Sequence, residues 1–261
     1  MAKAINDHLS SDFHWIINKY LEDNNIKVIK QDIDSWLLKV DETWLSFVWF
    51  YEIKRSFDIS TWKPYFADAN NYYALSKLSN LLWIDFFVLF YEKDKLRDHW
   101  VKIFKVNWLD WKNMFECLWI TKMNNLRSEL LKLSNLDLNG VREVALQWTS
   151  NNIYAVFNYF SNYNHLFYTE NENSRWMVLS DRDTFEPKVI YKEIKNTERK
   201  ESLLYDTAFI KIAKQLNLPI FKFTYSENNN KILSFNDLNS WEIIDDMVLN
   251  DFLKKYTSYI K

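Results

Sequence analysis

The stretch Leu45-Ser-Phe-Val-Trp-Phe-Tyr-Glu-Ile-Lys54 joins a strand-like run to two charged side chains. Aromatic and β-branched residues fill its apolar part, and this composition favours a β-strand. Successive strand side chains point to opposite faces, so Glu52 and Lys54, two positions apart, point to the same face. We therefore expect a carboxylate and an ammonium group to share one cleft where this strand ends.

The flanking segments alternate between helical and strand patterns. They predict, in chain order, a helix, three strands, a helix and two more strands over the ranges 11–22, 26–33, 36–40, 45–53, 68–82, 84–91 and 101–106. The sixth of these ranges is almost continuously apolar, which is typical of a strand buried in the middle of a sheet. This order of elements predicts an α/β domain built in layers.

A similar order returns in the second half of the chain. Glu193-Ile-Lys195 repeats Glu52-Ile-Lys54, and a helical pattern and two strand patterns follow each tripeptide. We interpret this as an internal duplication of a unit of about 120 residues, with domains at 1–136 and 137–261. Two unrelated α/β halves that share a tripeptide by chance are the open alternative.

An acid from a neighbouring strand would complete a site around Glu52. Asp34 precedes the predicted hairpin that leads to Glu52, and Asp32 competes with it for this role. Two carboxylates supply the oxygen ligands that Mg²⁺ prefers, with Mn²⁺ as the alternative ion. The metal lowers the pKa of a bound water and neutralises a phosphodiester, while Lys54 positions the nucleophile or stabilises developing charge. Without the second acid, Glu52 and Lys54 form an ordinary ion pair at a strand end.

In their order along the chain, Asp34, Glu52 and Lys54 resemble the motif of the PD-(D/E)xK nuclease superfamily, which has the restriction-endonuclease-like fold. The resemblance implies two tandem domains, each a mixed sheet of about four to five strands flanked by helices. It also implies Mg²⁺-dependent hydrolysis of DNA phosphodiester bonds. Lys63-Pro-Tyr-Phe66, after the motif, is similar to small prophage-type members and implies a phage or mobile-element origin. One departure is that no proline precedes the aspartate.

The second copy of the tripeptide lacks an obvious first carboxylate. Glu193 and Lys195 are retained, but Ser174 or Arg175 stands where the first copy has Asp34. Glu172 and Asp181 are the acids that could substitute, but neither is at a position that clearly matches that of Asp34. We therefore predict a degenerate second site, used for packing or substrate docking.

The charge pattern is compatible with DNA binding through local patches. The net charge of −2 gives no global attraction to phosphate. Arg55 and Lys63 lie beside the predicted site, and we expect them to contact the DNA backbone. The alternative function is a non-catalytic nucleic-acid-binding or scaffold protein that retains the nuclease fold.

Composition also predicts a cytoplasmic protein that does not enter a membrane. The longest apolar run, 81–91, contains Asp85 and is too short to span a bilayer. The lone Cys117 excludes an intrachain disulfide framework, and we expect it to be a plain buried residue. The sequence carries no signal of oligomeric state.

The chain contains 13 tryptophans and a single glycine, Gly140. Average glycine usage is about 7%, so most of the expected glycine is missing. Several tryptophans stand where a turn or a helix end favours glycine: Trp44, Trp83, Trp108 and Trp111. A bulky residue at positive φ carries a steric penalty that glycine avoids. We therefore predict that many tryptophans are UGA codons that the native organism reads as glycine, with a truly Trp-rich protein as the alternative.

Peptide mass spectrometry of the native protein tests this recoding. We expect glycine masses at most of the tryptophan positions, because the backbone there favours a residue without a Cβ atom. Indole masses at Trp83 and at the two tryptophans of the 107–112 segment would contradict the prediction.

Overall fold

The computed structural model describes residues 12–32, 35–40, 45–56, 60–92, 100–108, 110–122, 125, 129, 165–169, 174–195, 203–226 and 231–260. Its contacts group the chain into two compact units. Unit 1 contains residues 1–32, 67–82 and 170–261, and unit 2 contains residues 33–66 and 83–169. Segments of the two units alternate along the sequence. The predicted boundary between 136 and 137 lies outside the described residues, and the two sequential domains stay a prediction.

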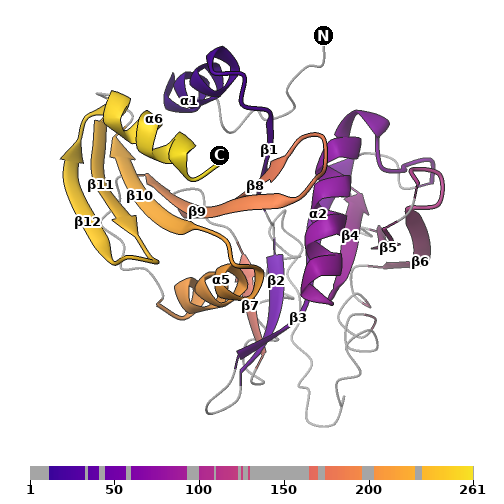
Figure 1. The fold of residues 1–261 in the computed structure, drawn as a ribbon. Coiled ribbons are helices and arrows are strands. Elements are labelled where there is room, and N and C mark those ends of the chain that lie inside the picture. Colours follow the sequence, from indigo (N-terminus) through magenta and orange to yellow (C-terminus); the bar gives the residue numbers. More distant parts are fainter. Residues whose placement is uncertain are drawn as a thin grey trace. The chain divides into compact units, whose positions relative to one another are not determined.

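Unit 1 is built on a six-stranded mixed sheet in the order β1-β8-β9-β10-β11-β12 (Figure 1). Its strands are β1 (Val28–Asp32), β8 (Ser174–Asp181), β9 (Pro187–Lys195), β10 (Ile220–Ser226), β11 (Lys231–Asp237) and β12 (Glu242–Met247). The described helices of this unit are α1 (Asp12–Asp23), α2 (Ala69–Leu82), α5 (Leu203–Leu216) and α6 (Leu249–Ser258).

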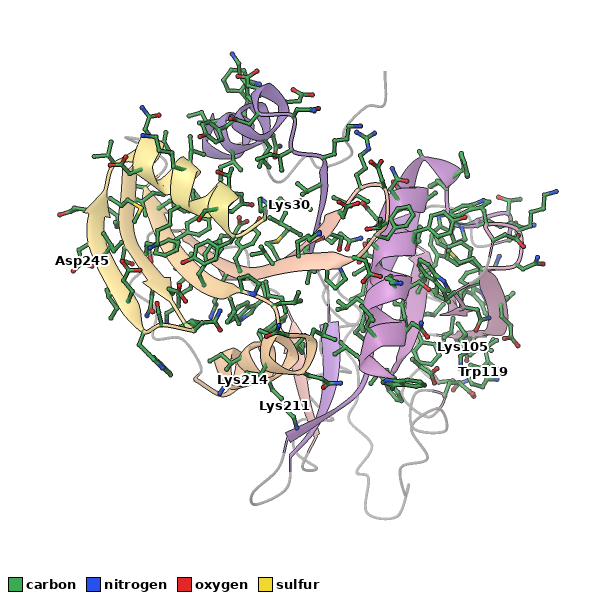
Figure 2. The ribbon with its side chains drawn as sticks, viewed as in Figure 1. Lys30, Lys105, Trp119, Lys211, Lys214 and Asp245 are labelled. Carbon is green, nitrogen blue, oxygen red and sulfur yellow. The ribbon has the colours of Figure 1, made fainter. Side chains whose placement is uncertain are left out.

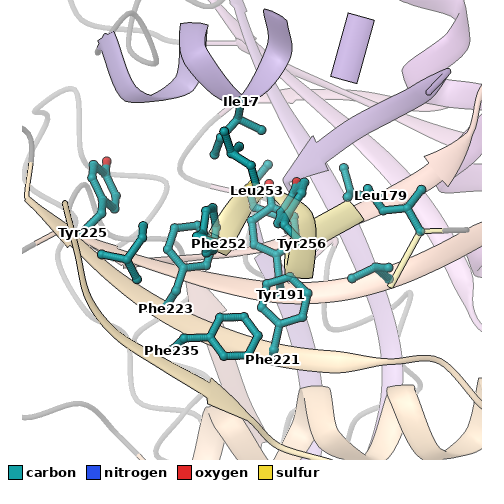
Figure 3. Packing of buried hydrophobic residues seen from close by; sticks show 14 of the residues in the cluster. Ile17, Leu179, Tyr191, Phe221, Phe223, Tyr225, Phe235, Phe252, Leu253 and Tyr256 are labelled. Atoms are coloured by element: carbon teal, nitrogen blue, oxygen red, sulfur yellow. The ribbon is translucent and has the colours of Figure 1, made fainter. Parts of the chain in front are cut away.

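Helices cover both faces of this sheet. On one face α1 and α6 bury Ile17 and Phe252 against a row of rings that includes Tyr191, Phe221 and Phe223 (Figure 3). On the other face Trp176 of β8 stacks on Phe209 of α5, with ring centroids 4.4 Å apart. The unit therefore has an aromatic core on each side, which accounts for the apolar runs on both faces of its central strands.

Unit 2 is built on a second six-stranded mixed sheet in the order β6-β5-β4-β3-β2-β7. Its strands are β2 (Ser35–Val40), β3 (Leu45–Ser56), β4 (Asp85–Glu92), β5 (Trp100–Val106), β6 (Phe115–Lys122) and β7 (His165–Thr169). A 3-10 turn, η1 (Phe66–Asp68), follows the loop after β3. Central strand β4 carries fully buried Phe86, Val88 and Phe90, as its continuous apolar pattern predicts.

The two sheets have the same connectivity. In each, an antiparallel hairpin (β2–β3 or β8–β9) precedes a parallel pair (β3–β4 or β9–β10) whose connection contains a helix. Two further antiparallel strands follow in each sheet. This shared order agrees with the similar order of elements read from the sequence.

Each sheet is completed by a strand from elsewhere in the chain. Strand β1 immediately precedes β2 in sequence but pairs with β8. Strand β7 immediately precedes β8 in sequence but pairs with β2. The two sheets thus exchange their outer strands reciprocally. The exchanged strand, β1 or β7, is the sixth strand of its sheet. The prediction of about four to five strands per sheet was too low because it did not include this strand.

Most predicted elements of the two sheets are confirmed within one to four residues of their bounds. The sequence patterns did not predict β6, β7, β12 or α6, and the edge strands β6 and β12 are largely exposed. The sequence also predicts a helix near 122–133 and turns at 41–44 and 228–230. Lys122 belongs to β6, and the rest of these ranges lies almost entirely outside the described residues. None of the helices in the described part of the chain is long and apolar enough to cross a membrane.

Two tryptophans occupy positions with a left-handed backbone. Trp83, just after α2, has φ 58° and is 90% exposed, and Trp241, between β11 and β12, has φ 61° and is 72% exposed. Asn217, just after α5, has the same role with φ 52°. Asparagine tolerates this conformation, whereas an indole carries a steric cost there and buries little of its surface.

The turn around Trp241 also occurs between β8 and β9, with Phe185 at the left-handed position. In both turns an aspartate, Asp181 or Asp237, accepts hydrogen bonds from two backbone N–H groups that follow it. A large ring at Phe185 shows that this turn accepts a residue other than glycine. The recoding of Trp241 therefore stays a prediction.

Other tryptophans are core residues. Trp49, Trp62 and Trp176 are buried, with 2%, 5% and 0% exposure. Trp62 stacks on Phe90 with ring centroids 4.1 Å apart. Replacing such a ring with glycine removes packing and leaves a cavity. Among the described tryptophans, Trp83 and Trp241 thus occupy exposed turns where glycine suits the backbone, and Trp49, Trp62 and Trp176 occupy the core, while others such as Trp15 of α1 belong to neither kind.

Substituting the exposed tryptophans tests this division. Trp83→Gly is expected to raise the free energy of unfolding by about 1 kcal/mol, because it relieves a left-handed strain and loses almost no burial. Asn217→Gly, at the matching helix end, should change it much less. Trp176→Gly should lower it by about 3 kcal/mol or more. Chemical denaturation measures all three, and destabilisation by Trp83→Gly would show that the indole makes a stabilising contact.

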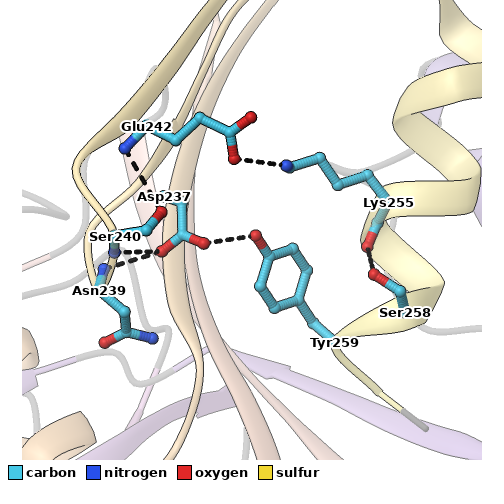
Figure 4. Close-up of polar contacts among 7 residues, drawn as sticks. All are labelled: Asp237, Asn239, Ser240, Glu242, Lys255, Ser258 and Tyr259. Carbon is cyan, nitrogen blue, oxygen red and sulfur yellow. Dashed lines mark hydrogen bonds and ion pairs between the residues drawn. The ribbon is translucent and has the colours of Figure 1, made fainter.

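A polar network fixes α6 to the β11–β12 hairpin (Figure 4). The Tyr259 hydroxyl donates a 2.6 Å hydrogen bond to Asp237 Oδ2, and the backbone amides of Asn239 and Ser240 donate to Asp237 Oδ1. Lys255 of α6 pairs with Glu242 at 2.7 Å. Burial by itself raises the pKa of Asp237, but these hydrogen bonds outweigh it, and the pKa lies below its ordinary value. For Tyr259, burial and then the bond to Asp237 raise the pKa of the phenol.

These shifts predict a pH dependence of stability. The depressed pKa of Asp237 contributes stability above the unfolded-state value of about 4, and this stability is lost as pH falls through the folded-state pKa. The raised pKa of Tyr259 contributes stability below about pH 10, and this stability is lost as pH rises further. Tyr259→Phe should lower the free energy of unfolding by about 1 kcal/mol at neutral pH and flatten the alkaline loss. Thermal unfolding across pH measures this, and an unchanged alkaline limb would contradict it.

Candidate functional site

The tripeptide of β3 places two opposite charges on one face of sheet B, the sheet of unit 2. Lys54 Nζ donates a 2.6 Å hydrogen bond to Glu52 Oε1, and the two side chains are 31% and 12% exposed. In register, Glu52 lies beside Val88 and Lys54 beside Phe90 of β4. The carboxylate is thus held between an apolar strand and a lysine, with limited access to water.

A loop segment lies over the same face next to Lys54. Phe90, the neighbour of Lys54 in register, is also the neighbour of Lys102 of β5. Lys102 is 6% exposed, and its Nζ donates to the carbonyl oxygens of Ser60 and Trp62 at 3.1 and 3.4 Å. The Trp62 ring covers Phe90. Residues 60–62 are therefore fixed across the sheet beside the Glu52–Lys54 pair.

The other predicted substrate-binding residues belong to this region. Lys63 follows Trp62 and is exposed. Arg55 is part of β3, one residue after Lys54, and its side chain lies outside the described part. Lys63 thus adds a positive charge beside the loop that covers the sheet.

The structure describes one of the two candidate first carboxylates, Asp32. Asp32 is the last residue of β1 and pairs in register with Met177 of β8, so it belongs to unit 1. Asp34 lies outside the described residues, so its predicted place beside Glu52 stays a prediction. Among the residues that the structure describes, no group of three or more His, Cys, Asp or Glu side chains is arranged to hold a metal ion.

The second copy of the tripeptide has a different environment. Glu193 of β9 is 4% exposed and pairs with Lys30 of β1 at 3.3 Å. Lys30 is labelled on β1 in Figure 2. On the neighbouring strand β8, the register partner of Glu193 is Arg175. Lys195 ends β9, and its side chain lies outside the described part. Sequence reasoning missed Lys30 because it lies 163 positions away and comes from the exchanged strand.

Buried groups surround this second pair. Tyr191, two residues before Glu193, is fully buried, and burial followed by the nearby charges of Tyr256, Glu193 and Asp32 raises the pKa of its phenol. The Lys30 ammonium also lies 5.7 Å from the Tyr191 ring centroid. Glu193 is thus a buried, ion-paired carboxylate next to the aromatic core of unit 1. The degenerate role predicted for Glu193 and Lys195 stays a prediction that this burial favours.

Two further sequence-based interpretations are changed by the structure. Asp181, a candidate substitute for the first carboxylate, is a turn residue whose pKa is lowered mainly by the hydrogen bond from the Thr184 amide. Glu172, the other substitute, lies outside the described residues. Cys117 was expected to be buried, but it is exposed because it lies on the edge strand β6.

Comparisons with known proteins give no functional assignment. No protein-family model and no curated protein matches the chain. Among solved structures, the chain is similar to the sex pheromone staph-cAM373 precursor, with 10% identity, a TM-score of 0.21, and coverage of 90% of this chain and 81% of that one. A second similar structure is the C-terminal domain of this precursor from Staphylococcus aureus, with 8% identity, a TM-score of 0.17, and coverage of 85% and 69%. Similarities this low carry no argument about fold or function.

Proposed function

We propose that the protein is a metal-dependent nuclease that hydrolyses DNA phosphodiester bonds at a site formed by Glu52, Lys54 and Asp34. The single observation that supports this most is the placement of Glu52 and Lys54. Their side chains meet on one sheet face at 2.6 Å, at the end of a strand whose parallel neighbour follows through a helix. The resemblance to the restriction-endonuclease-like fold, in tandem copies, belongs to the same proposal.

Each residue of the candidate site has a distinct role in this proposal. Glu52 supplies carboxylate oxygens, and its half-buried position keeps them oriented. Lys54 holds its ammonium group beside those oxygens, where it can orient a water or a phosphate oxygen. Lys63 and Arg55 attract the DNA backbone.

The cofactor in this proposal is Mg²⁺ or Mn²⁺. When bound, such an ion acts as a Lewis acid and lowers the pKa of a bound water. The described residues supply one carboxylate to it, that of Glu52, and the second ligand in the proposal is Asp34. The hard carboxylate oxygens of these two acids match the donors that both ions prefer.

A non-catalytic nucleic-acid-binding or scaffold protein is the second candidate. The direct ion pair of Lys54 with Glu52 Oε1 favours it, because the ammonium group holds an oxygen that a metal would need. In this reading the pair stabilises the end of β3, and nucleic acid binds without being cleaved. Metal-dependent cleavage separates the two functions.

Incubation with supercoiled plasmid tests the proposal. The protein should nick DNA with Mg²⁺ or Mn²⁺ and lose this activity in EDTA. Glu52→Gln should reduce nicking to background, and Lys54→Met should slow it on the order of 100-fold, because each removes a group at the reacting phosphate. Nicking by Glu52→Gln at the wild-type rate would overturn the assignment.

Two glutamate variants serve as controls. Glu116→Gln, at an exposed position of β6, should leave nicking unchanged. Glu193→Gln should lower the unfolding midpoint, because Lys30 loses its buried partner, while the folded fraction nicks at the normal rate. Loss of activity in folded Glu193→Gln equal to that in Glu52→Gln would show that the second site also takes part in cleavage.

A further inference from the structure

Two neighbouring aromatic side chains of unit 2 face solvent. Tyr65 is 56% exposed and Phe66 is 72% exposed. Exposed Lys63 lies just before them, with Pro64 between. Large exposed rings next to each other are uncommon on a protein surface without a partner, and they mark this loop as an interaction surface.

The loop that carries these rings is fixed at its start. Lys102, buried in sheet B, donates to the carbonyl oxygens of Ser60 and Trp62. The Trp62 ring stacks on Phe90 and makes an edge contact with Tyr65 at 6.3 Å between centroids. The rings are thus presented by an anchored loop, which reduces the entropy lost on binding.

The surface continues onto the β5–β6 hairpin. The Phe66 ring packs edge-on against Trp111 at 5.4 Å, and exposed Lys112 follows in sequence. The carboxylate of Asp110 accepts hydrogen bonds from the Lys112 amide and the Asn113 side chain, so it acts within the turn. We name Lys63, Tyr65, Phe66 and Lys112 the aromatic–lysine surface. Trp111 is left out of the definition because it is one of the predicted glycine positions.

We propose that the aromatic–lysine surface binds single-stranded nucleic acid. Exposed rings stack on unpaired bases, and the ammonium groups of Lys63 and Lys112 contact the phosphates between them. In a duplex the base faces stack on one another, so few of them are available to stack on these rings. This proposal rests on the proposed function in one respect: it names the single-stranded part of the DNA, such as a flap or an end, as the substrate.

The position of the surface supports this role. Tyr65 contacts Trp62, Trp62 covers Phe90, and Phe90 is the register neighbour of Lys54. A strand that stacks on Tyr65 and Phe66 therefore lies a few side chains away from the Glu52–Lys54 pair. The surface would hold the strand, and the pair would act on its backbone.

Fluorescence anisotropy with labelled oligo-dT tests this proposal in EDTA, where binding is measured without cleavage. We expect saturable binding that is tighter than for a duplex of the same length. The double variant Tyr65→Ala/Phe66→Ala should bind at least about tenfold more weakly, because one stacked base is lost per ring. Lys63→Ala/Lys112→Ala should reduce the slope of log K against log salt by roughly 0.7 for each phosphate contact.

Controls separate this surface from folding and from other partners. Ile243→Ala removes an equally exposed apolar side chain from unit 1 and should leave binding unchanged. All variants should keep the wild-type unfolding midpoint. An oligo-rU arm shows whether the strand is DNA or RNA, and vesicles of anionic lipid test a membrane surface. Absence of dT and rU binding, equal binding by Tyr65→Ala/Phe66→Ala, or loss of vesicle binding alone in that variant would overturn the proposal. Binding without any nicking would keep this inference and refute the nuclease activity.

Discussion

The pairing of β1 with β8 is the interaction on which unit 1 depends. It brings five residues from near the start of the chain into the sheet formed by residues 174–247, across a large sequence separation. The ion pair between Lys30 and Glu193 supports this register. A slip of one residue would turn Lys30 to the opposite face and leave a buried carboxylate without its partner, which is costly. Strand β1 is therefore an integral part of the sheet of unit 1.

This strand exchange determines which sheet carries Asp32, one of the two candidate first carboxylates. Asp32 and Asp34 stand two positions apart, and in sequence either can serve as the first carboxylate beside Glu52. In the structure the chain leaves the sheet of unit 1 at Asp32 and enters the sheet of unit 2 at Ser35. Asp32 therefore lies on the same sheet as Glu193, and the role of Asp34 beside Glu52 stays a prediction.

Residues 60–62 lie over the face of sheet B that carries Glu52 and Lys54. A buried lysine, Lys102, binds two loop carbonyls, and a tryptophan stacks over the strand beside the ion pair. An ammonium group in an apolar sheet is unfavourable unless it finds such acceptors. The hydrogen bonds of Lys102 and the stacking of Trp62 on Phe90 therefore both hold this loop next to the candidate site, with its exposed rings and Lys63. Fold and surface are coupled at this point.

The sequence by itself determined the local elements, because helix and strand patterns have periods that neighbouring residues reveal. It also placed Glu52 and Lys54 on one face, since strand side chains alternate, and it located Trp83 at a left-handed helix end. Edge strands β6 and β12 escaped prediction because exposed strands lack a clear apolar period. The tertiary structure alone decided that β1 joins β8, that Lys30 pairs with Glu193, and that Lys102 anchors a loop. These contacts join residues far apart in the chain, and their energy comes from burial and register, which no local pattern records.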